Sequence, residues 1–126
     1  SSGANRLNDT QALRDRIEKL GHSGTPLHQD VLSIECVLLD RADDPRAVEV
    51  ATKSAAVALK LYGPTHSDTL NSRYVLVRAL RGAARYQEAA HEARDLAAVV
   101  ERVQGETSSF HRHVLVEEYQ AFDGLN

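Results

Sequence analysis

The stretch Gly63-Pro64-Thr65-His66-Ser67-Asp68-Thr69-Leu70 lies at the centre of a repeating pattern. Gly21 lies 42 residues before Gly63, and Gly105 lies 42 residues after it. Each glycine is followed by a helical pattern, a short break and a second helical pattern. A fixed period of about 20–50 residues with two helices in each period is typical of an α-solenoid, whose units bury their apolar faces against their neighbours. We therefore predict an all-α superhelix of about six antiparallel helices and no strand.

Apolar residues at steps of three and four predict where the helices run. The first ends at Gly21, and the last ends at Asp123-Gly124. Polar residues and prolines predict the starts between them, because their side chains or fixed backbone suit a first helical turn. We expect helices over 27–42, from Asp44-Pro45 to Tyr62, from Ser67 or Asp68 to about Ala84, from Tyr86 to Val103, and from Ser108 or Ser109 onward.

The chain is one domain in this interpretation. It consists of a partial repeat over 4–20, complete repeats over 21–62 and 63–104, and a partial repeat over 105–126. When the two complete repeats are aligned without gaps, small residues coincide, including Ala47 with Ala89 and Ala51 with Ala93. Small side chains at such positions allow two helices to approach closely.

The composition fits a soluble globular protein. Of 126 residues, 42% are hydrophobic and 26% are charged. The net charge of −3 comes from 15 basic and 18 acidic residues that are scattered along the chain, so we expect neither nucleic acid nor a membrane surface as a partner. A lone Cys36 cannot form an internal disulfide, and no long apolar run is present. We expect a cytoplasmic location.

The residues that could support catalysis or metal binding do not form a recognisable set. His111 and His113 are two residues apart, so on a helix they point to different sides and do not chelate one ion. Cys36 could be a nucleophile, but a cysteine within an apolar helix is far more often a core residue. We predict no enzyme activity, no metal and no cofactor.

The central repeat resembles a known family. The run from Gly63 to Arg73, followed by Ala79-Leu80-Arg81 and Arg85-Tyr86-Gln87-Glu88-Ala89, looks like the tetratricopeptide repeats of the kinesin light chain type. Those repeats have a 42-residue period and are common in large bacterial regulatory proteins, particularly of actinomycetes. Such repeats usually carry an asparagine pair facing a concave groove, and Tyr74 and Val75 occupy those positions here.

The resemblance implies a module that binds a protein or peptide through its concave face. The alternative is a sensory or regulatory domain that holds a small effector or signalling peptide for an attached NTPase or transcription-regulator domain. Arginines in the central repeat would fork onto carboxylates of a partner. The candidate groove residues are Asn71, Tyr74, Val75, Arg78 and Arg81, with Gln29, Leu32 and Cys36 one period earlier and His113 and Gln120 one period later.

The last helical segment carries an apolar stripe of Val116, Tyr119 and Phe122. No helical pattern follows it in the sequence to cover the stripe. Exposed stripes of this kind tend to find partners, so we predict self-association through the terminal helices. The alternative is that Phe122 folds back on Leu96 or Val100 of the preceding helix.

Overall fold

The computed structural model describes residues 2–125, with side chains from Asn5 to Leu125. It contains six helices and no strand among these residues, which confirms the predicted fold class. The helices are α1 (Ser2–Lys19), α2 (Pro26–Arg41), α3 (Arg46–Tyr62), α4 (Ser67–Gly82), α5 (Tyr86–Gln104) and α6 (Ser109–Gly124).

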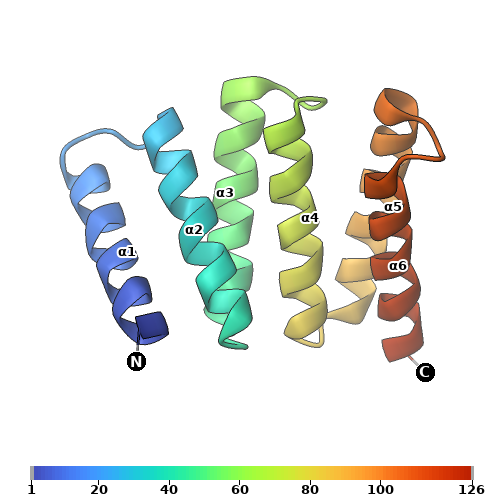
Figure 1. Ribbon diagram of the computed structural model, residues 1–126, viewed down its shortest axis with the longest axis horizontal. Helices are drawn as coiled ribbons and strands as arrows, with labels where there is room; N and C mark the ends of the chain where they lie inside the picture. Colours follow the sequence, from blue (N-terminus) through green and yellow to red (C-terminus); the bar gives the residue numbers. More distant parts are fainter. Residues whose placement is uncertain (1, 126) are drawn as a thin grey trace.

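The six helices stand side by side in an antiparallel row, with the two ends of the chain at opposite ends of the row (Figure 1). α2 contacts α4, and α4 contacts α6, in addition to the contacts between consecutive helices. Within residues 2–125, α1, α3 and α5 make no contact with one another. The row is therefore curved, with α2, α4 and α6 on its inner, concave side. No helix among these residues has the length and apolarity needed to cross a bilayer.

The three glycines of the repeat follow the ends of α1, α3 and α5, and each has a positive φ. Gly21, Gly63 and Gly105 have φ of 81°, 87° and 88°. This region of backbone space is readily accessible to glycine and strained for residues with a Cβ. The amides of Gly63 and Gly105 each donate to the carbonyl four residues back, of Leu59 and Glu101, whereas the amide of Gly21 donates to Glu18, three residues back. The turn that ends α1 therefore differs from the two that follow it.

The helix after each glycine begins with a side-chain cap. Thr25 and Ser108 accept hydrogen bonds from the backbone amides of His28 and His111, at 3.2 and 3.0 Å. The prediction of Ser67 or Asp68 as the central cap was wrong. The ring nitrogen Nδ1 of His66 accepts from the amide of Asp68 at 3.1 Å, because the helix already begins at Ser67.

The first repeat differs from the others by one residue. Pro26 begins α2 five residues after Gly21, whereas Ser67 and Ser109 begin α4 and α6 four residues after their glycines. Consequently α4 repeats α2 at an offset of 41 residues and α6 repeats α4 at 42. Helix α5 repeats α3 at an offset of 42 residues, as the buried residues of the two helices show by coinciding at that spacing. This one-residue shift decides which α2 side chains reach the concave face.

The core consists of two adjoining clusters. The first joins α2, α3, α4 and α5 through small and aliphatic residues such as Leu39, Ala51 and Leu80. The second fills the junction of α4, α5 and α6 with larger aliphatic side chains. The difference between the junctions of α2–α3–α4 and α4–α5–α6 creates the candidate site.

Candidate binding groove

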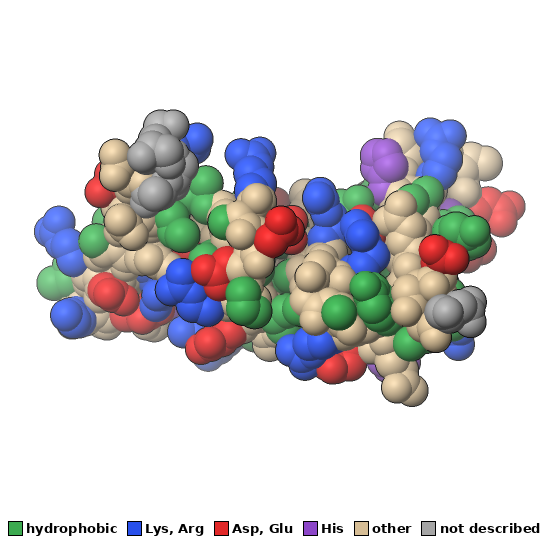
Figure 2. Space-filling model, turned by 90° about the horizontal axis from the view of Figure 1, so that it is seen from below, with side chains coloured by type: hydrophobic (Ala, Val, Ile, Leu, Met, Phe, Trp, Pro, Cys, Tyr) green, Lys and Arg blue, Asp and Glu red, His purple; other side chains and the backbone are tan. Residues whose placement is uncertain are grey.

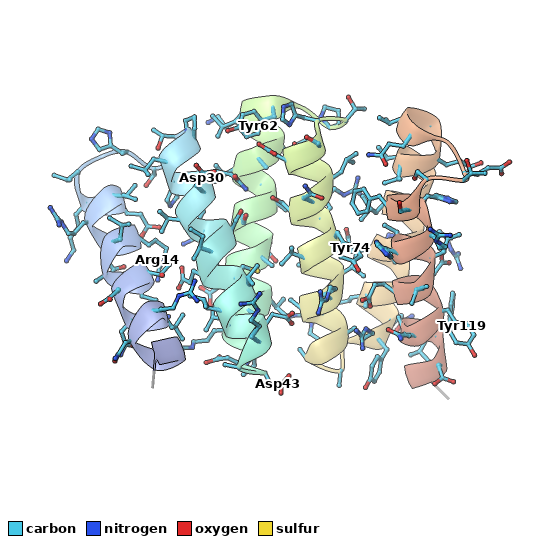
Figure 3. The ribbon with its side chains drawn as sticks, in the orientation of Figure 1. Arg14, Asp30, Asp43, Tyr62, Tyr74 and Tyr119 are labelled. Atoms are coloured by element: carbon cyan, nitrogen blue, oxygen red, sulfur yellow. The ribbon has the colours of Figure 1, made fainter. Side chains whose placement is uncertain are left out.

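A groove of about 260 Å³ lies on the concave side between α2 and α4, with α3 beneath it. We call it the α2–α4 groove. Its apolar lining consists of Cys36, Val37, Ala51 and Val75, and its rim carries Asp30, Asp68 and Asn71. Asp30 lies on the upper half of α2 in Figure 3.

The floor of the groove is a hydrogen-bonded cluster from three helices. The carboxamide nitrogen of Gln29 lies 2.9 Å from Ser33 Oγ, 3.2 Å from Ser54 Oγ and 3.0 Å from Ser72 Oγ. The hydroxyls of Ser33 and Ser54 are themselves 3.3 Å apart. Gln29, Ser54 and Ser72 are all buried. The cluster therefore ties α2, α3 and α4 together by polar contacts at a position where helices normally pack through apolar ones.

The junction of α4, α5 and α6 shows which residues occupy the equivalent positions where this groove is absent. Counted with the offsets of the structure, Gln29, Ser54 and Ser72 correspond to three fully buried apolar residues. These are Leu70, Leu96 and Val114, each with 0% exposure. The same three places in the fold are thus a polar floor in one repeat and an apolar core in the next.

The space above the floor is open at the junction of α2 and α4 but filled at the junction of α4 and α6. Between α4 and α6 it is filled by Tyr74 and Phe110, whose rings pack edge to face with centroids 5.6 Å apart. The corresponding residues between α2 and α4 are Ser33 and Asp68. Burial of Tyr74, together with the nearby carboxylate of Glu117, raises the pKa of its phenol although Arg78 and Arg81 oppose the shift. The α2–α4 groove is open because a small and an acidic residue replace the two aromatic rings that fill the other junction.

The charges around the groove are of one sign. Asp30 and Asp68 line it, and its lining contains no lysine, arginine or histidine. Neither carboxylate forms an ion pair with any residue in the described part of the chain. Elsewhere basic and acidic side chains lie next to each other, as Figure 2 shows across the lower end of the row. The groove therefore carries two exposed carboxylates that no basic side chain of the described residues pairs with.

The two arginines that the sequence placed in the groove are engaged within the chain. Arg81 donates from Nε and Nη2 to both carboxylate oxygens of Glu117 on α6. This hydrogen bond, acting against partial burial, raises the pKa of Arg81. Arg78 is more exposed and lies 3.7 Å from Asp40 and 3.9 Å from Glu117. Both arginines lie outside the lining of the α2–α4 groove.

The structure brings together only part of the set of candidate residues. Asn71, Val75, Gln29 and Cys36 all line the groove, and the side chains of Gln29 and Cys36 are buried. Leu32 is fully buried in the core, since its side chain falls one position away from the concave face. The remaining candidates, Tyr74 at the second junction and His113 and Gln120 on α6, do not line it.

Sequence reasoning missed some of the groove residues of α2 and α3. Asp30 and Val37 line the groove, and an offset of 41 rather than 42 residues would have identified them from Asn71 and Arg78. The extra residue in the first upper loop was the only available signal. Ser54 had no signal, because it reaches the groove floor from a helix of the outer layer.

Cys36 is inert at neutral pH in this environment. Its side chain is buried, and its thiol lies 3.8 Å from the carbonyl oxygen of Ala47. Burial, with the carboxylates of Asp40 and Glu35 nearby, raises its pKa to about 12. A nucleophilic cysteine needs a lowered pKa, so the arrangement is that of a core residue. In the part of the chain that the structure describes, no three His, Cys, Asp or Glu side chains are grouped to hold a metal ion.

A larger groove of about 640 Å³ lies on the other side of the row, between α3, α4 and α5. Part of its charged lining is paired internally, since Arg85 donates to Glu88 at 2.9 and 2.6 Å. None of the buried polar side chains lines it. Its volume is therefore not accompanied by groups arranged toward a ligand, and we regard the α2–α4 groove as the better candidate.

Comparisons with protein-family models, with curated proteins and with solved structures gave no match to this chain.

Proposed function

We propose that this chain is a binding module of the tetratricopeptide-repeat type that holds an extended segment of a partner protein in the α2–α4 groove. The observation that carries the proposal is the polar floor of Gln29, Ser54 and Ser72, which occupies the places of Leu70, Leu96 and Val114 at the next junction.

The energetics of the floor support a binding role. Burial of a polar side chain costs free energy, and its internal hydrogen bonds return only about 0.5–1.5 kcal/mol each. Burial of a leucine instead contributes about 1.5–3 kcal/mol. The first junction therefore gives up apolar packing that the second junction has. A surface that can hydrogen-bond a partner segment accounts for this loss of stability.

The dimensions favour a segment of a protein over a small effector. Sites for small molecules usually measure about 300–1,000 Å³ and enclose most of the ligand. The groove is smaller, at about 260 Å³, and lies open on a surface formed by successive helices. It suits one side chain and its flanking backbone, with the rest of the segment lying along the concave face.

The groove can be tested by filling it with the residues of the second junction. The five substitutions are Gln29→Leu, Ser33→Tyr, Ser54→Leu, Asp68→Phe and Ser72→Val. We call this variant the junction graft, and we expect it to be at least as stable as the unaltered protein. A phage-displayed random peptide library is selected on both proteins. Peptides that bind the unaltered chain should lose at least tenfold in affinity for the junction graft.

A matched control alters the opposite face. Thr52→Ala, Gln87→Ala and His91→Ala change the groove between α3, α4 and α5 without touching the concave side. This control should bind the selected peptides normally. If the junction graft remains folded and binds the same peptides as well as the unaltered chain, or if only the control loses them, the proposed function is wrong for this groove.

A further inference from the structure

We propose that the α2–α4 groove selects a segment carrying a lysine or arginine side chain, which inserts between Asp30 and Asp68. The inference rests on the proposed function, because it names the chemistry of the ligand that this groove binds.

The charge of the groove is the first argument. Its lining contains the two carboxylates and no basic side chain, and neither carboxylate is neutralised by an ion pair from the described residues. Two other carboxylates on the concave side have a partner within the chain: Asp40 has Arg78, and Glu117 has Arg81. A cation supplied by a partner would complete at this groove the pairing that the chain makes for itself elsewhere.

The hydrogen-bonding groups of the groove are the second argument. The amide nitrogen of Gln29 faces the three serine hydroxyls, while its oxygen accepts no hydrogen bond from any residue in 5–125. Every fully buried side-chain oxygen in that range has a partner, so this oxygen is not fully buried, and Gln29 lines the groove. The groove therefore offers carboxylate and amide oxygens. Ammonium and guanidinium groups carry only donors, which makes them the complementary ligands.

The walls of the groove are the third argument. Val37 on α2 and Val75 on α4 face the opening, with Cys36 and Ala51 deeper. The aliphatic stem of lysine or arginine packs on apolar walls while the charged head reaches polar groups. An acidic or phosphorylated side chain would meet the repulsion of Asp30 and Asp68. An aromatic ring, which fills the same space at the second junction, would leave the oxygens of this groove without donors.

Nuclear magnetic resonance can test the inference directly, because Gln29 and Asn71 have side-chain amide groups in the groove. The probes are the blocked tripeptides Ac-Ser-X-Ser-NH₂, with arginine, lysine, glutamate, norleucine or tyrosine as X. The arginine and lysine peptides should shift the amide signals of Gln29 and Asn71 in a saturable way. The glutamate, norleucine and tyrosine peptides should bind at least tenfold more weakly.

Charge-neutralising variants separate the site from a general attraction to an acidic protein. Asp30→Asn with Asp68→Asn should weaken binding of the arginine peptide at least tenfold. The control, Asp9→Asn with Asp123→Asn, removes the same charge from exposed positions on α1 and α6 and should leave it unchanged. Equal weakening in both variants, or no saturable shift by either basic peptide, would overturn the inference. If norleucine or tyrosine peptides shift the same signals more strongly, the ligand class is wrong while the groove itself remains a binding site.

Discussion

Arg81 on α4 and Glu117 on α6 form a two-pronged ion pair across the concave face, with Nε 2.6 Å from Oε2 and Nη2 3.3 Å from Oε1. The Glu117 side chain is only 7% exposed, whereas that of Arg81 is 33% exposed. The pair therefore fixes the last helix against the central one. It also occupies the donors that the sequence had suggested for a partner.

Removal of the arginine should destabilise the protein. Loss of one partner from a fully buried ion pair costs about 3–5 kcal/mol, because the other charge stays buried without compensation. Arg81 is partly exposed and water can approach Glu117, so we expect Arg81→Gln to lower the free energy of unfolding by about 2 kcal/mol, scaled down from that range. Urea denaturation measures the change.

Two further variants make this prediction specific. Arg78→Gln removes a more exposed arginine whose nearest carboxylate contacts are 3.7 and 3.9 Å, so it should change stability by less than about 0.5 kcal/mol. Arg81→Gln combined with Glu117→Gln removes the stranded charge and should recover part of the loss. Similar losses for Arg78→Gln and Arg81→Gln would show that the pair has no special role. Arg81 stabilises the fold through this pair. A variant that reverses the charge of both Arg78 and Arg81 would therefore not distinguish a loss of partner binding from a loss of stability.

The repeated glycine turn leads to a second prediction. Gly63 has φ of 87° and ψ of 174°, and a Cβ built at this position meets no atom within 4 Å. The cost of Gly63→Ala is thus purely one of backbone conformation, which we expect to be about 1–3 kcal/mol. Gly82→Ala is the control, since Gly82 lies in α4 and its Cβ would make an ordinary contact of 3.7 Å with Asp40. It should be neutral or stabilising by up to about 1 kcal/mol. Thermal or urea unfolding that ranks the two variants in the opposite order would refute this account.

The architecture could be predicted from the sequence because each repeat contains residues that mark where its helices begin and end. Gly21, Gly63 and Gly105 require a backbone that few other residues adopt, and the apolar periodicity between them leaves only helices. The groove could not be predicted as well. The outline of the groove depends on how α2 is rotated about its own axis. One additional residue before Pro26 turns the helix by about 100° relative to a strict 42-residue count. At the observed offset Leu32 lies in the core, and half-buried Ser33 takes the place that Tyr74 has at the next junction.

Sequence reasoning placed Gln29 in the groove but did not find the floor that it forms with Ser54 and Ser72, for a different reason. Gln29, Ser54 and Ser72 come from three helices, and each alone is an ordinary polar residue within a helical pattern. They can be recognised as one polar cluster only from the packing, which brings them to one junction. Leu70, Leu96 and Val114 lie together at the equivalent junction. Tyr74 illustrates the converse, since the sequence predicted it to line the groove but it fills its junction against Phe110.

The buried thiol gives a prediction about pH. The pKa of Cys36 is raised from its ordinary value of 9.0 to about 12 in the folded chain. Between these values the unfolded chain loses the thiol proton while the folded chain keeps it, so stability falls as pH rises through this window. The slope contributed by one such group is at most about 1.4 kcal/mol per pH unit. Urea denaturation between pH 8.5 and 10.5 should show a steeper loss for the unaltered protein than for Cys36→Ala.

The Cys36→Ala variant retains every tyrosine and lysine that also titrates in this range, so the difference between the two proteins isolates the thiol. The same burial predicts that the thiol reacts with a disulfide reagent at pH 8 only after unfolding. Rapid labelling of the folded protein, or parallel pH profiles for the two proteins, would contradict the assignment of Cys36 to the core.

The last prediction concerns the outer face of α6. In α4 the positions Leu70, Val77 and Leu80 are buried, whereas their equivalents in α6 are Arg112, Tyr119 and Phe122, all exposed. Tyr119 is 71% exposed and Phe122 41%, and the guanidinium of Arg94 lies 5.6 Å from the Phe122 ring centroid. Leu115 and Val116 extend this apolar surface. The face that α5 covers on α4 is therefore open on α6.

We expect this open face to make the 126-residue chain associate as its concentration rises, since contiguous exposed apolar surface favours contact with a second molecule. Sedimentation velocity should show an increase in mean mass between about 10 µM and 1 mM, the range in which weak interfaces form. Tyr119→Glu with Phe122→Glu should restore the monomer. Leu59→Glu is the control, because Leu59 is 50% exposed on α3, away from both terminal helices, and its replacement should leave association unchanged. A constant monomer mass throughout this range would refute the prediction. Association that Leu59→Glu abolishes as completely as the α6 variant would place the contact elsewhere on the row.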